Sequence, residues 1–166
     1  NRMVSVSLWI FFPLAITLHN MEEAIWLPKW SENAKQFHKP VEANVFYFAV
    51  IFVTLLAYLS TFLAIAFPSS WVWKNIFHGF LGAMILNIFF PHLVSTIILR
   101  KYSPGLATGL FLLIPVNSII LYQSVMFGNI KLPDLALSIL VVSIVLLSLL
   151  PLFFKIGEQL TNQIEA

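Results

Sequence analysis

Long stretches almost without charged side chains dominate this sequence. The stretch from residue 44 to 67 contains no Asp, Glu, Lys or Arg, and a helix of about 20 apolar residues is long enough to cross the hydrocarbon core of a membrane. Polar breaks separate it from four further apolar stretches, at 3–26, 75–99, 105–127 and 135–154. We therefore predict an all-α fold, a polytopic membrane bundle of about five transmembrane helices that forms a single domain over residues 1–166.

The composition excludes a water-soluble fold. Hydrophobic residues make up 60% of the chain and charged residues only 10%, whereas soluble globular domains average about 25% charged residues. So short a chain has too little interior to hide that much apolar surface from water. The net charge of +2 is too small and too scattered for a nucleic-acid interface, so we expect no nucleic-acid partner. The absence of cysteine excludes disulfides and thiolate metal sites.

The distribution of basic residues predicts the orientation in the membrane. The first stretch has no small-residue cleavage site after it, only HNMEEAIWLPKW, so we interpret it as a retained helix and not as a secretory signal. With five spans, three Lys and Arg residues fall on the side of the N-terminus and six on the other. Because cytoplasmic loops carry the excess of positive charge, we expect the N-terminus outside and the C-terminus in the cytoplasm. The six are Lys29, Lys35, Lys39, Arg100, Lys101 and Lys155.

Few ionisable residues lie inside the predicted spans, and each is costly there, so each is a candidate for function. They are His19, Glu22, Glu23, His78 and His92. Glu22 and Glu23 follow His19 by three and four residues, so either carboxylate can share a helix face with the imidazole. At 1.5 Å per residue, His19 and His92 both lie roughly 12 to 15 Å from the cytoplasmic edge, whereas His78 is about 21 Å from His92. His78 is therefore not expected in the same site.

These residue types at one depth suggest a metal site. Two histidines and a carboxylate with a vacant fourth position form a catalytic zinc arrangement. We predict His19, Glu23 and His92 as ligands of a divalent metal, with Glu22 and Glu23 as the catalytic carboxylates, one binding the metal and the other moving protons. Imidazole with carboxylate suits both zinc and non-haem iron, and of the two we favour zinc.

Structural roles are the alternative for the same residues. The glutamates could reach for headgroup water at the end of the helix, His92 could hydrogen-bond a neighbouring helix, and Arg100 could fold back to pair with the carboxylates. Against this, no Lys or Arg lies inside any predicted span. A metal ion would supply the missing positive charge.

Three motifs together resemble a known family. His19 opens an HxxEE motif, Asn87 precedes His92 in a later span, and Tyr102-Ser103-Pro104-Gly105 is followed by Thr108. This combination resembles the bacterial HXXEE domain family, which implies a small multi-span protein of the bacterial cytoplasmic membrane with a polar site, and implies no substrate. A tight turn at Pro104 and Gly105 would bring Tyr102 and Thr108 to the side of His19 and His92. We expect Asn87, Tyr102 and Thr108 to support the site or contact a substrate.

Three functions fit these observations. The first is a metal-dependent, hydrolase-type enzyme whose partners are membrane lipid and a small, lipid-like or otherwise amphiphilic substrate. The second is a small proton- or metal-coupled transporter, since carboxylate and histidine pairs also relay protons, and with only five spans it would need to form a homodimer. The third is a non-catalytic accessory subunit whose polar cluster holds helices together.

Overall fold

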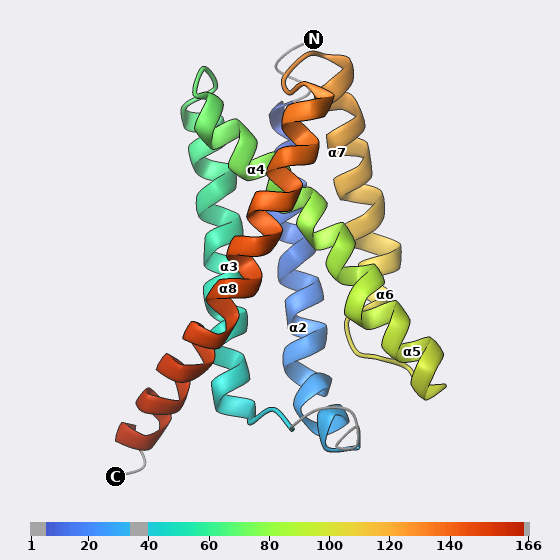
Figure 1. The fold of residues 1–166 in the computed structure, drawn as a ribbon, viewed down its shortest axis with the longest axis vertical. Coiled ribbons are helices and arrows are strands. Elements are labelled where there is room, and N and C mark those ends of the chain that lie inside the picture. Colours follow the sequence, from blue (N-terminus) through green and yellow to red (C-terminus); the bar gives the residue numbers. More distant parts are fainter. Residues whose placement is uncertain (1–5, 34–39, 165–166) are drawn as a thin grey trace.

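A computed structural model describes residues 6–33 and 40–164 of the 166-residue chain. The described residues form helices and no strand, which confirms the predicted all-α class. Figure 1 shows α2 in the middle of the bundle, with α3 and α7 on either side and α4 crossing from one to the other. In chain order the elements are η1 (Leu8–Ile10), α2 (Phe11–Glu32), α3 (Ala43–Ala66), α4 (Trp71–Asn87), η2 (Ile88–Leu93), α5 (Val94–Leu99), α6 (Leu106–Thr108), η3 (Gly109–Leu113), α7 (Ile114–Met126) and α8 (Leu132–Ile164).

Four helices in the described part of the chain are long and apolar enough to cross a membrane. They cover Ala43–Ala66, Trp71–Leu99, Leu106–Met126 and Leu132–Ile164. The middle turns of α2 carry His19, Asn20, Glu22 and Glu23, which lowers the hydropathy of this helix. The helix α8 continues to Ile164, beyond the predicted end of its span at residue 154. By helix length and composition the chain is a helical membrane protein.

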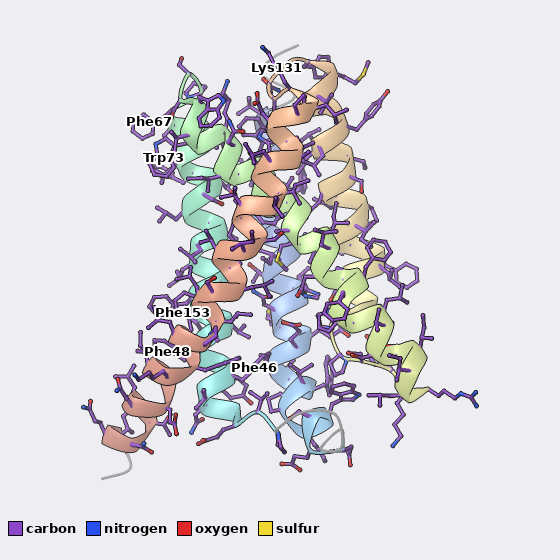
Figure 2. All side chains as sticks on the ribbon, in the orientation of Figure 1. Phe46, Phe48, Phe67, Trp73, Lys131 and Phe153 are labelled. Atoms are coloured by element: carbon purple, nitrogen blue, oxygen red, sulfur yellow. The ribbon has the colours of Figure 1, made fainter. Side chains whose placement is uncertain are left out.

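Successive helices alternate in direction, so the connections gather at two ends of the bundle (Figure 1). Figure 2 shows Lys131 and the turn flanked by Phe67 and Trp73 at one end, while Phe46 and Phe48 lie toward the other. The end of α2, the start of α3, the turn from α5 to α6 and the end of α8 lie at this second end. Glu22 and Glu23 of α2 lie against segment 102–108 at this end.

Small residues let α4 and α8 approach closely. A Cβ atom on Gly79 would lie 2.6 Å from the backbone oxygen of Ser138, and one on Gly82 would lie 2.3 Å from the side chain of Ile139. The Ser138 hydroxyl donates to the Asn75 side chain across the same interface at 2.7 Å. Close contact through small residues and interhelical hydrogen bonds is how membrane helices associate.

The helix that begins with α4 is interrupted where it reaches the polar residues. Pro91 has no N–H to donate to the preceding turn, and Phe90 adopts an extended conformation with φ −135° and ψ 112°. As a result, the helix widens into the π-helical turn η2. On an uninterrupted helix Asn87 and His92 would point about 140° apart, but here the Asn87 side-chain Nδ2 lies 3.4 Å from His92 Nε2. The interruption turns both side chains toward α2.

Candidate metal centre

Three side chains from two elements form a compact cluster in the bundle. His19 and Glu23 lie one turn apart on α2, and His92 comes from η2. Glu23 Oε1 is 2.8 Å from His92 Nε2 and 3.7 Å from His19 Nε2, and one ligand atom from each residue lies within 4.8 Å of the other two. Both histidines are buried. The group could hold a metal ion, and it consists of the three ligands predicted from the sequence.

The hydrogen bonds of His19 leave its Nε2 atom available as a ligand. The Thr108 hydroxyl donates its single proton to Glu22 Oε2 at 2.5 Å. It must therefore accept from His19 Nδ1, which lies 3.2 Å away, because a hydroxyl has one proton to donate. With the proton on Nδ1, the Nε2 lone pair faces the cluster, where Nε2 has no hydrogen-bond partner among the described residues.

His92 is held in the same manner. Its Nδ1 lies 3.5 Å from the hydroxyl of Ser103, and the Ser103 backbone N–H donates to Thr96 Oγ1 at 3.0 Å. Its Nε2 faces Glu23 and the amide of Asn87. Metal-binding histidines usually present one ring nitrogen to the ion while a protein group fixes the other, and Thr108 and Ser103 occupy that second position here.

Glu22 points away from the cluster and toward the turn at 102–108. Its Oε1 accepts from the Tyr102 hydroxyl, and its Oε2 accepts from both the backbone N–H and the hydroxyl of Thr108. The Ala107 N–H in turn donates to the Tyr102 oxygen at 3.0 Å. Partial burial, followed by the hydrogen bond to Glu22, raises the pKa of Tyr102, so the hydroxyl stays protonated at neutral pH. This geometry favours a positioning role for Glu22, Tyr102 and Thr108.

The turn itself lies directly against the cluster at Gly105. This residue has φ +95°, and a Cβ atom there would lie 2.8 Å from the His92 ring, 2.9 Å from the His19 ring and 3.1 Å from Glu23 Cγ. Only glycine combines this backbone conformation with so close an approach. The sequence motif predicts a turn at Gly105 but not the contact of this residue with both imidazoles.

The other ionisable candidates lie elsewhere. His78 is buried at a different level, where its Nδ1 lies 2.7 Å from the Lys74 carbonyl oxygen and its ring meets Trp9, so its predicted exclusion from the site is confirmed by its position. Arg100 is exposed, in a left-handed conformation at the end of α5. Among the described residues, the ion-pair partners of Glu23 are the two histidines alone, so the cluster has no Lys or Arg counter-charge there.

A cavity of about 500 Å³ opens beside the cluster, between α2, α3, α4 with η2, and α8. Glu23, His92 and Asn87 are part of its wall, together with Ser95 and Ser103. Neither His19 nor Glu22 lines it, so these two residues lie behind that wall. The sequence did not predict this cavity, because it depends on how the long helices cross.

Comparison with known proteins decides the family. A family model described as "Protein of unknown function with HXXEE motif" matches residues 9–120. The chain belongs to the HXXEE family. Its relatives include the "Uncharacterized protein YrkK" of Bacillus subtilis (strain 168), which is 54% identical over 151 residues, covering 91% of this chain and 96% of the relative. No solved structure matches this HXXEE protein. The resemblance seen in the sequence is thus confirmed.

Proposed function

We propose that this HXXEE protein is a metal-dependent, hydrolase-type membrane enzyme that acts on a lipid-like or amphiphilic substrate. One observation carries the proposal: two members of the His19–Glu23–His92 cluster face a largely apolar cavity among helices long enough to cross a membrane. The cluster supplies the chemistry and the cavity supplies a place for an amphiphile. Pockets with a few convergent polar groups in apolar walls are the usual form of small-molecule sites.

The donor set fits zinc best. Two imidazoles and one carboxylate are a known catalytic ligand set that leaves a fourth position open. With bonds of about 2.0 Å, tetrahedral ligands lie about 3.3 Å apart, and the distances of 2.8 and 3.7 Å from Glu23 Oε1 bracket that value. The buried Nε2 of His19 has no hydrogen-bond partner among the described residues, and a bound ion would give it one. A bound divalent ion would supply acidity to a water molecule and polarise a substrate carbonyl.

The other steps of the proposed hydrolysis are assigned to individual side chains. Glu23 is the carboxylate that lines the cavity among the described residues. Because Glu22 is held by Tyr102 and Thr108, we assign both roles to Glu23: Oε1 would face the ion, and Oε2 can accept a proton from the attacking water. The water oxygen bonds to the carbonyl carbon, the bond from that carbon to the leaving oxygen or nitrogen breaks, and Glu23 returns the proton to the leaving group. Asn87, beside His92 Nε2, orients the carbonyl. Glu22 holds Thr108, which fixes the tautomer of His19.

We expect Thr108→Val to weaken zinc binding about 10- to 100-fold, the usual effect of losing a partner of a metal-bound histidine. Valine keeps the shape of threonine but removes the hydroxyl that joins His19 to Glu22. Titration with Zn²⁺ against a chromophoric chelator measures the change. Thr161→Val is the matched control, because its hydroxyl binds a carbonyl of its own helix near the end of α8. Equal affinities for the two variants would refute the role of Thr108.

Turnover tests the enzyme directly. Zinc-loaded protein in nanodiscs should hydrolyse members of a panel of long-chain esters and amides, and Glu23→Gln should lower the rate by about 100- to 10,000-fold, the range for general acid–base groups. Glu42→Gln, which changes a carboxylate before the start of α3, should keep the rate. Failure to hydrolyse any of the panel, together with metal-dependent uptake into proteoliposomes, would replace this proposal with the transporter.

A further inference from the structure

The cavity beside the cluster has two unlike walls. Glu23, Asn87, His92 and Ser95 contribute polar groups from α2, α4, η2 and α5. The lining side chains from α3 are all apolar, and those from α8 are apolar except for Ser143; Ala49 and Leu150 are among them. A ligand that fills this space therefore presents a polar group to one side and hydrocarbon to the other.

The dimensions of the cavity match one hydrocarbon chain. Its lining runs along α8 from Ser143 to Phe154, which is about 16 Å at 1.5 Å per residue. The volume of about 500 Å³ lies within the range of about 300–1,000 Å³ that small-molecule sites have. A single acyl chain with a small polar end fits a space of this length and volume.

The charges around the cavity favour an uncharged polar end. Among the described residues that line it there is no Lys or Arg, and Glu23 is an acid. A phosphate is normally recognised by arginine, lysine or several backbone N–H groups. An ester or amide carbonyl needs only one or two donors, and the amide of Asn87 and the hydroxyls of Ser95 and Ser103 lie on the polar wall.

We propose that the cavity binds a single-chain, uncharged acyl ester or amide, with its chain against α3 and α8 and its carbonyl at Glu23, His92 and Asn87. This inference names the substrate class of the proposed enzyme and rests on it for the fate of the carbonyl. Binding of the acyl chain, however, does not require turnover, so it can be tested on protein without metal.

Photo-crosslinking tests the proposal in nanodiscs that contain the full chain. The probe is a monoacylglycerol with a diazirine in its acyl chain, and labelled residues are located by mass spectrometry. We expect labels on cavity-lining residues of 143–154 that unlabelled monoacylglycerol competes away, with or without chelator. A lysophosphatidate of the same chain length should compete at least tenfold more weakly. Equal competition by lysophosphatidate, or labels that no competitor removes, would overturn the proposal.

A matched pair of variants tests whether the acyl chain lies in the cavity. Ala49 is buried and lines the cavity, so Ala49→Phe should fill part of the space and lower the competed labelling at least tenfold. Ala136, exposed on α8, gives the control Ala136→Phe, which should label as the wild type does. Undiminished labelling of folded Ala49→Phe would contradict the proposal. If the wild-type protein binds the acyl chain but binds no metal, the proposal of a metal-dependent enzyme fails while this inference stands.

Discussion

Removal of either histidine of the cluster is expected to abolish metal binding. His19→Ala and His92→Ala each delete one of three donors, and the loss of zinc affinity should exceed the roughly 10- to 100-fold effect of an outer partner. Among the described residues, the group that could hold the ion consists of His19, Glu23 and His92, so the loss of one histidine leaves two of its three donors. Metal content of the purified variants and Zn²⁺ titration measure the loss.

The third buried histidine provides the matched control. His78 lies on α4, outside the cluster, with its Nδ1 at the carbonyl of Lys74. His78→Gln should therefore leave zinc affinity unchanged while changing a buried histidine of the same bundle. Circular dichroism and gel filtration in detergent report whether each variant remains folded. Retention of stoichiometric metal by folded His92→Ala, or its loss from folded His78→Gln, would show that the metal binds elsewhere.

Gly105→Ala should also damage the site severely, although the residue contributes no ligand. Its methyl group would lie 2.8 Å from the ring of His92 and 2.9 Å from that of His19, so the two rings must move apart or the turn must lift away. The left-handed conformation adds about 1–2 kcal/mol of strain for any other residue. We expect zinc affinity to fall more than tenfold and the thermal midpoint to drop.

A substitution at Gly128 separates the effect of backbone strain from the effect of contact with the imidazoles. It also has a positive φ, of +71°, but a Cβ atom there would meet nothing within 4 Å. Gly128→Ala should therefore lose stability through backbone strain and keep its affinity for zinc. If both variants bound zinc as the wild type does, the contact of Gly105 with the two imidazoles would have no consequence for the site.

The grouping of His19, Glu23 and His92 could be predicted because it depends on regular helix geometry. A spacing of four residues puts His19 and Glu23 on one face, and counting residues from the charged ends of two helices gives His19 and His92 the same depth. The first helix, in contrast, is not among those apolar enough to cross a membrane, because the site residues themselves reduce its hydropathy.

The remaining parts of the site depend on irregular backbone. Asn87 reaches His92 because the helix is interrupted at Phe90 and Pro91, and a regular helix would separate them. Ser103 and Gly105 meet the imidazoles because segment 100–105 folds back onto α2, with left-handed residues at Arg100 and Gly105. The role of Glu22 follows from this fold, since its partners Tyr102 and Thr108 lie eighty or more positions along the chain.

The metal content of the wild-type protein tests the central claim most directly. The chain is purified in detergent without chelator, its metals are measured by inductively coupled plasma mass spectrometry, and the same sample is then titrated with Zn²⁺. The His19–Glu23–His92 cluster predicts about one zinc per chain after titration, bound in competition with a chelator and released by His19→Ala. Wild-type protein that is folded, metal-free and unable to take up zinc or iron would contradict the account.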